Sequence, residues 1–196
     1  MSHTPSKEAE YWNQRYRQNQ TGWDIGHAAP ALVEFAQHIP NKNISVLIPG
    51  CGNAYEAEAL LKMGFYNITL LDIAPMLTEA LRNRLKQTPI KVVTGDFFTH
   101  EGQYDLILEQ TFFCAIDPAR RSEYIKKMHE LLTPGGLLVG LLFDRSFEGG
   151  PPFGGSKTEY EILLSHLFTI QKMESCYNSI APRAGTELFF IAQRKP

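Results

Sequence analysis

Residues 46–56 read VLIPGCGNAYE: an apolar run leads into a glycine-containing turn and then into the start of a helical pattern. Gly50 and Gly52 permit backbone conformations, and a close approach of a ligand, that a Cβ atom would block. The dinucleotide-binding form of this turn has Gly or Ala three residues after its second glycine, where the helix faces a pyrophosphate. Tyr55 occupies that position here. The stretch indicates a strand, turn and helix of an α/β sheet, and it favours a nucleoside ligand that lacks a pyrophosphate.

Apolar runs and helical patterns alternate on both sides of this stretch. Runs typical of buried strands occur at residues 45–48, 68–72, 90–94, 104–109 and 137–143. Helical patterns lie between them at residues 55–63, 76–85 and 120–132, and Thr133, Pro134 and Gly135 end the last one. Parallel strands need crossover connections, so the alternation predicts a doubly wound α/β sheet. Two more strands, 167–173 and 187–193, are close enough in sequence to form an antiparallel pair at one side of that sheet.

The overall composition is that of an ordinary globular chain, and its 196 residues are predicted to form one domain. Nineteen Lys and Arg against 21 Asp and Glu give a net charge of -2. A basic field for nucleic acid or anionic lipid is therefore absent, and a small-molecule partner is expected. The three cysteines, Cys51, Cys114 and Cys176, lack the close spacing of a zinc site, so no metal is expected.

The N-terminus lacks the apolar stretch of a signal peptide, and no apolar run reaches the ~18 residues needed to cross a bilayer. We therefore expect a cytoplasmic protein, working as a monomer.

Acidic residues follow the second and third predicted strands. Asp72, followed by Ile73, stands 22 residues after Gly50 (72 minus 50), which suits a carboxylate that accepts hydrogen bonds from both hydroxyls of a ribose. Alternatively, Asp72 is the N-cap of the helix near Pro75. Asp96 and Phe97 follow the third strand and suit an adenine, although Asp after Gly is also a common turn pair.

The fourth predicted strand ends at Glu109 and Gln110, just before Phe112 and Phe113. Ligands of open α/β sheets bind beyond such carboxyl ends, so ligand contacts are expected here. Cys114 is interpreted as a buried, unreactive thiol, because no neighbouring base or cation is evident in the sequence. Phe153, in the Gly- and Pro-rich stretch 149–155, is predicted to lie in a loop on the substrate side.

Three aromatic residues, Trp12, Tyr16 and Trp23, crowd into the polar segment 1–27 that precedes the first strand. They either cover the sheet as simple hydrophobic packing or form a lid over a cofactor.

Taken in order, these motifs resemble the thiopurine S-methyltransferase family, particularly its thiol and halide methyltransferase branch. The stretches that carry the resemblance are residues 12–26, 49–52, 71–73, 96–98, 112–116 and 149–153. The resemblance covers nearly the whole chain and implies a Rossmann-like class I methyltransferase with a seven-stranded sheet. It also implies S-adenosylmethionine as methyl donor, S-adenosylhomocysteine as product, no metal, and a small thiol or a halide as acceptor.

The resemblance assigns roles to individual residues. It implies that the lid rings contact the cofactor and that the glycine turn lies alongside the methionine part of the cofactor. The residues after the second strand would bind the ribose, and those after the third strand would bind the adenine. The cofactor residues implied are Trp12, Tyr16, Trp23, Gly50, Gly52, Asp72, Ile73, Asp96, Phe97 and Glu109, and the acceptor residues are Gln110, Phe112, Phe113 and Phe153.

The chain departs from the family pattern at three places. Asn53 and Ala54 stand where a further glycine is common, Tyr16 replaces a Trp, and Gln110 replaces a Tyr that often faces the acceptor in the thiol and halide branch. Catalytic residues are not assigned, and Glu109, Asp24 and Tyr55 are the candidates for a general base. The alternatives are methyl transfer to oxygen or nitrogen, a noncatalytic S-adenosylmethionine-binding protein, and a nicotinamide-dependent oxidoreductase, which Tyr55 disfavours.

Overall fold

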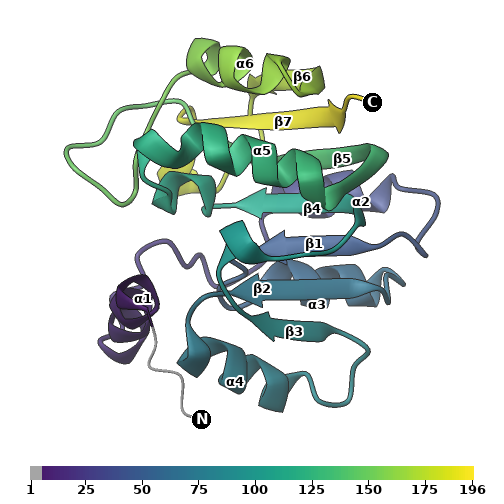
Figure 1. The fold of residues 1–196 in the computed structure, drawn as a ribbon, viewed down its shortest axis with the longest axis vertical. Coiled ribbons are helices and arrows are strands. Elements are labelled where there is room, and N and C mark those ends of the chain that lie inside the picture. Colours follow the sequence, from purple (N-terminus) through teal and green to yellow (C-terminus); the bar gives the residue numbers. More distant parts are fainter. Residues whose placement is uncertain (1–5) are drawn as a thin grey trace.

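A computed structural model describes residues 6–196, so the first five residues of the predicted lid segment 1–27 lie outside the described residues. Seven strands form one sheet in the order β3-β2-β1-β4-β5-β7-β6 (Figure 1). They are β1 (Val46–Pro49), β2 (Ile68–Asp72), β3 (Lys91–Thr94), β4 (Tyr104–Gln110), β5 (Leu132–Phe143), β6 (Phe168–Ser175) and β7 (Glu187–Arg194). The first five strands pair in parallel, and β7 runs antiparallel to both β5 and β6. The predicted sheet, including its antiparallel last pair, is confirmed.

The described residues form six α-helices, and all but α1 cover the two faces of this sheet. They are α1 (Lys7–Arg17), α2 (Pro30–Gln37), α3 (Tyr55–Lys62), α4 (Pro75–Arg84), α5 (Arg121–Leu131) and α6 (Lys157–Ser165). Successive strand residues point to opposite faces. Ile48 of β1 therefore packs in the core cluster with residues of α2, α3 and α4, whereas its neighbour Leu47 packs in the cluster with residues of α5 and α6. None of the helices in the described part of the chain is long and apolar enough to cross a membrane.

The start of β5 differs from the prediction. The helix predicted to reach residue 132 ends at Leu131, and the strand begins at once at Leu132, five residues before its predicted start (137 minus 132). The pairing between β4 and β5 shifts register near its beginning, and Gly135 adopts a φ of 77° there. Glycine tolerates this left-handed conformation, so a stretch with the composition of a turn is absorbed into an irregular strand.

The helices α1, α2 and α6 were not predicted, although all three carry sequence signals for a helix start. Ser6 caps α1, where its hydroxyl accepts a hydrogen bond from the Ala9 N–H. Pro30 occupies the first position of α2, and Ser156 and Glu159 form a capping box at the start of α6.

Helix α1 lies beyond the arrowheads of the parallel strands, at their carboxyl edge (Figure 1). Its buried Asn13 anchors it there, because the Asn13 Oδ1 atom accepts a hydrogen bond of 3.2 Å from the Met76 N–H in the first turn of α4. A helix leaves its first N–H groups without intrahelical partners, and here a neighbouring helix supplies one. The aromatic N-terminal segment is therefore fixed over the edge where ligands of such sheets bind.

Candidate functional site

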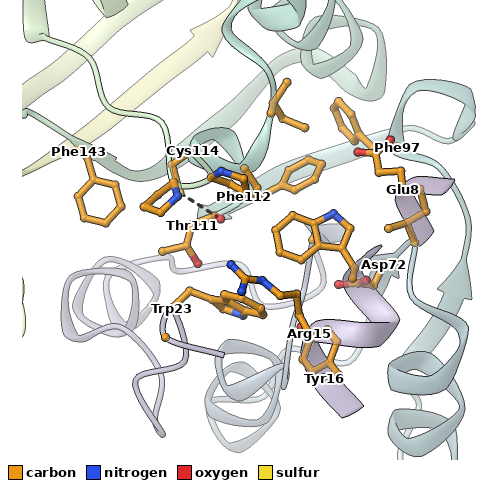
Figure 2. A pocket seen from close by; sticks show the side chains of 18 of the residues that line it. Glu8, Arg15, Tyr16, Trp23, Asp72, Phe97, Thr111, Phe112, Cys114 and Phe143 are labelled. Atoms are coloured by element: carbon orange, nitrogen blue, oxygen red, sulfur yellow. Dashed lines mark hydrogen bonds between the residues drawn. The ribbon is translucent and has the colours of Figure 1, made fainter. Parts of the chain in front are cut away.

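A cavity of about 590 Å³ opens at the carboxyl edge of the sheet, between the N-terminal segment and the ends of the strands (Figure 2). Many of the predicted site residues share its wall. They are Trp12, Tyr16, Trp23, Gly50, Asp72, Ile73, Asp96, Phe97 and Phe112. These residues lie far apart in sequence, and the sheet brings them together.

The three aromatic residues of the N-terminal segment form one wall of the cavity. The Trp23 ring meets those of Trp12 and Tyr16 edge to face, with centroid separations of 5.3 and 5.7 Å. Such perpendicular pairs stabilise an aromatic cluster beyond simple burial. The Trp23 carbonyl accepts a hydrogen bond of 2.8 Å from Nη2 of Arg183, which lies in the loop before β7. Trp23 is thus held by the rings of its own segment and by Arg183 from the C-terminal part of the chain.

Asp24 ties the same segment to the glycine turn. Its Oδ1 atom accepts a hydrogen bond from the Gly26 N–H, and its Oδ2 atom accepts from the Asn53 side-chain amide and, at 3.3 Å, from the Tyr55 hydroxyl. Neither Asp24 nor Tyr55 lines the cavity. Two of the three candidate bases are therefore engaged with each other outside it.

The glycine turn brings the backbone close to the cavity. Gly50 and Gly52 have φ values of 57° and 50°, and a Cβ atom on Gly50 would overlap the ring of Phe112. Ala54 also adopts a left-handed φ of 59°. The family's further glycine thus corresponds to a place where this chain holds an alanine in a conformation that glycine adopts more easily.

Asp72 presents a buried carboxylate at the end of β2. Its oxygens accept hydrogen bonds from the backbone N–H groups of Gly52, at 3.3 Å, and Ala74, at 3.0 Å. Burial raises its pKa to about 6, because desolvation disfavours the charged form. Ala74 is the N-cap of α4 and no side chain caps that position, so Asp72 is not the helix cap of the alternative interpretation. Each carboxylate oxygen can accept a second hydrogen bond, such as one from a ribose hydroxyl.

A second acidic group follows β3. The Asp96 side chain accepts a hydrogen bond of 2.9 Å from the Phe98 N–H and so caps the short helical turn Phe97–Thr99. The Phe97 ring meets that of Phe112 edge to face at 5.1 Å. Glu8 of α1 also lines the cavity, and its pKa is raised by burial and by the nearby Asp96. The acidic side chains of the wall are therefore gathered near the ends of β2 and β3.

Glu109 lies beneath the cavity wall. It is fully buried, and its Oε1 atom accepts hydrogen bonds of 2.9 Å from the N–H groups of Phe112 and Phe113, while its Oε2 atom accepts one of 2.5 Å from the Tyr124 hydroxyl. Gly140 stands opposite on β5, where a Cβ atom would overlap the Glu109 side chain. Burial raises the pKa of Glu109. This carboxyl fixes the loop after β4 and does not itself line the cavity.

Of the four residues predicted for the acceptor, only Phe112 lines the cavity. Phe113 points into the core, with its ring 5.0 Å from that of Tyr124. Phe153 donates its N–H to the Cys114 carbonyl at 2.6 Å, and the wall is formed by the prolines before it, at 151 and 152. Gln110 lies off the wall, and its buried Oε1 atom has no hydrogen-bond partner among residues 6–196.

Thr111, Cys114 and Phe143 occupy the wall at this end (Figure 2). Thr111 adopts a φ of 54°, which turns the chain away from the strand. The Cys114 thiol donates to the Thr111 carbonyl at 3.3 Å, and burial raises its pKa to about 12. It is therefore a protonated thiol at neutral pH, in line with the interpretation of an unreactive cysteine.

Three arginines line the cavity that were not singled out from the sequence: Arg15 of α1, Arg145 just after β5, and Arg183. Arg145 follows the carboxyl end of a parallel strand, and this position alone could have marked it. Within the described chain, no group of three or more His, Cys, Asp or Glu side chains could hold a metal ion.

The glycine turn, the buried carboxylate on the next strand and the aromatic wall fit a nucleoside bonded to an uncharged or sulfonium-linked tail. With this sheet order, they define a class I S-adenosylmethionine-dependent methyltransferase. A solved structure of this class, the Burkholderia thailandensis 1,6-didemethyltoxoflavin-N1-methyltransferase with bound S-adenosylhomocysteine, has the same fold. Its TM-score is 0.75 at 19% identity, over 100% of this chain and 94% of that one.

The family model for thiopurine S-methyltransferase matches residues 7–189, and the chain belongs to this family. It is 32% identical to an Arabidopsis thaliana protein named probable thiol methyltransferase 2, over 90% of this chain and 81% of that one. It is 31% identical to thiocyanate methyltransferase 1 of Brassica oleracea, with the same coverage. The protein is therefore an S-adenosylmethionine-dependent methyltransferase that acts on small molecules.

Proposed function

We propose that the protein methylates the sulfur of small thiols. The observation that carries this proposal is that, among residues 6–196, no carboxylate or histidine lines the acceptor side of the cavity. The acidic wall residues, Glu8, Asp72 and Asp96, lie near β2 and β3, and no histidine of residues 6–196 lines the cavity. Transfer to an alcohol needs a positioned general base, whereas a thiol with a pKa near ~8.5 ionises partly by itself.

The residues of the chain act mainly by binding and orientation. When bound, S-adenosylmethionine would supply a methyl group on a positively charged sulfonium. The acceptor thiolate would form a new bond to the methyl carbon as the bond from that carbon to the sulfonium sulfur breaks, and the electron pair of the broken bond would stay on the sulfur of S-adenosylhomocysteine. The thiol proton is lost to solvent before attack. We propose that Asp72 holds the ribose, that Asp96 and Phe97 hold the adenine, and that the aromatic wall excludes water. Fixing two reactants in line contributes roughly 7–11 kcal/mol in favourable cases.

The N-terminal segment is proposed to be a cofactor lid. Its rings line the cavity, its Trp23 carbonyl is held by Arg183, and its Asp24 side chain bonds to the glycine turn. Glu109 is proposed to act as a positioning residue for the loop that carries Phe112. Neither role requires a proton transfer.

Halide or thiocyanate is a second candidate acceptor. Such anions are nucleophiles without deprotonation, and the relative from Brassica oleracea is named for thiocyanate. Arg183 brings positive charge to the acceptor side, which favours an anionic nucleophile of either kind.

The test is the release of S-adenosylhomocysteine with matched thiol, alcohol and amine acceptors, together with iodide and thiocyanate. We expect the thiol to be the best member of each matched set, turnover to rise with pH toward the pKa of the thiol, and activity to persist in EDTA. A preference for the alcohol or amine would support the O- or N-methyltransferase alternative. Cofactor binding without turnover of any acceptor would support the noncatalytic alternative.

We also expect the protein to be a cytoplasmic monomer. Gel filtration with light scattering tests the monomer, and fractionation of the source cells tests the location.

A further inference from the structure

The cavity wall is divided by charge along the order of the sheet strands. Asp72 ends β2 and Asp96 follows β3 on one side of β1, whereas Arg145 follows β5 and Arg183 precedes β7 on the other side. The third arginine of the wall, Arg15, comes from α1 and not from the sheet. Figure 2 shows Phe143 across the cavity from Asp72, Glu8 and Phe97. The acceptor end is therefore the basic end.

Two guanidinium groups at this end lie against a pair of phenyl rings. The rings of Phe143 and Phe147 meet edge to face at 5.1 Å. The Cζ atom of Arg183 lies 5.5 Å from the centroid of Phe143, and that of Arg145 lies 4.7 Å from the centroid of Phe147. Ring faces attract cations and hold their flat groups in place.

The charges of the two arginines are balanced differently. Arg183 is buried and pairs with the carboxylate of Glu187 at 3.3 Å. Arg145 has no carboxylate within ion-pair distance among residues 6–196. Its neighbour Asp144 is engaged elsewhere, since its Oδ1 atom accepts the Lys157 N–H at the start of α6.

The backbone of Arg145 is held firmly, although its side chain is exposed. Its carbonyl accepts a hydrogen bond of 3.0 Å from the Gly155 N–H, in an isolated antiparallel bridge. Gly154 packs so closely on that carbonyl that a Cβ atom would overlap it. A guanidinium on an anchored backbone, facing a cavity without a counter-charge, is suited to bind an anion of a ligand.

We infer that Arg145 recognises a carboxylate at the outer end of the acceptor, so that the preferred substrates are thiols that also carry a carboxylate. Arg145 is exposed and Phe143 is half-buried, and both line the cavity, so we place the guanidinium at the rim and the ring further in. The acceptor would thus place its apolar part against the phenyl rings, its sulfur inward and its carboxylate at the rim. This inference rests on the proposed thiol methyltransferase function.

The experiment uses para-mercaptobenzoate and its neutral counterpart, para-mercaptobenzamide. Turnover is measured for both, and binding of both to the protein saturated with S-adenosylhomocysteine is measured by calorimetry. An ion pair at a solvent-exposed rim contributes up to about 1 kcal/mol, so the acid should bind about three- to fivefold more tightly than the amide.

Arg145→Gln should remove this difference by raising Kd and KM for the acid about three- to fivefold more than for the amide, without loss of affinity for S-adenosylhomocysteine. Arg145→Lys should retain part of it. Arg17→Gln is the matched control, because Arg17 lies on exposed α1 surface paired with Glu10 and does not line the cavity.

Equal binding of acid and amide by the wild type would overturn the inference, as would loss of S-adenosylhomocysteine affinity in Arg145→Gln. An equal effect of that variant on iodide or thiocyanate turnover would also overturn it, because Arg145 would then serve the nucleophile. Failure to methylate either thiol would instead refute the proposed function, while the binding comparison would still decide whether Arg145 selects a carboxylate.

Discussion

Replacing Asp72 by Asn is expected to remove a pH-dependent loss of stability of the ligand-free protein and to weaken its binding of the cofactor. Burial raises the pKa of this carboxyl from 3.8 to about 6. Because the pKa is higher in the folded state, its stabilising contribution is complete below about pH 3.8 and is lost as pH rises through about 6. The difference of about two pH units corresponds to about 3 kcal/mol.

An asparagine resembles the protonated form of Asp72 in shape and charge, so the variant should lack this loss of stability. The amide keeps only one of the two oxygens that accept from Gly52 and Ala74, so Asp72→Asn should be less stable than the wild type below about pH 4. Relative to the wild type it should then gain up to about 3 kcal/mol as pH rises to about 7.5. The cofactor affinity should move in the opposite direction. The amide cannot offer charged acceptors to the ribose hydroxyls, a loss of about 1.5–3 kcal/mol, or roughly 10- to 150-fold in Kd.

Urea denaturation of the ligand-free protein at both pH values, and calorimetric titration with S-adenosylhomocysteine, measure the two effects. Asp105→Asn is the control, since hydrogen bonds from Ser45 lower the pKa of Asp105 and its replacement should destabilise the protein more at neutral than at acid pH. A stability difference for Asp72→Asn that does not change with pH would refute the reasoning on burial. Unchanged affinity would show that Asp72 does not hold the cofactor.

Three other changes test the remaining parts of the site. Gly50→Ala should lower both the melting temperature and the S-adenosylhomocysteine affinity, because alanine is strained at this left-handed φ and its Cβ atom would overlap Phe112. Gly26→Ala is the control: its φ is 76° but the space around it is open, so only the backbone strain should lower the unfolding free energy, by about 1 kcal/mol. Glu109→Ala leaves the N–H groups of Phe112 and Phe113 and the Tyr124 hydroxyl without an acceptor, at about 1–3 kcal/mol each. Its unfolding free energy, measured in urea, should therefore fall by at least about 3 kcal/mol, and by more than that of Glu109→Gln. A smaller loss would contradict the observed network. Removal of residues 1–24 should leave a folded sheet by circular dichroism but reduce S-adenosylhomocysteine affinity at least tenfold, about 1.4 kcal/mol, and unchanged affinity in the folded truncation would exclude the lid.

The sheet could be predicted because its strands are short apolar runs bounded by helical patterns, and the pairing of parallel strands follows from that alternation. The start of β5 could not, because Gly135 and its neighbours have the composition of a turn, and only the pairing with β4 draws them into a strand. Periodicity within one segment does not reveal such a long-range contact.

The cofactor side of the cavity was more predictable than the acceptor side. Asp72 and Asp96 lie at strand ends, where the position alone places a side chain at the active edge. After β4, however, the left-handed Thr111 turns the chain, so that Gln110 and Phe113 leave the wall while Phe112 and Cys114 remain on it. Nothing in the residue types at 110–114 indicates that turn, and the three arginines come from separate segments, with Arg15 more than a hundred residues before the other two.

The hydrogen bonds that hold the N-terminal segment in place have a consequence for the rate of product release. Asn13 holds it to α4, Asp24 to the glycine turn, and the Trp23 carbonyl to Arg183. If this segment covers the cofactor as proposed, spent S-adenosylhomocysteine leaves only after some of these bonds break, and their combined strength sets its residence time. Arg183 in turn is paired with Glu187 of β7. A substitution in the last strand, outside the cavity, could therefore change the rate of product release without touching the reacting atoms.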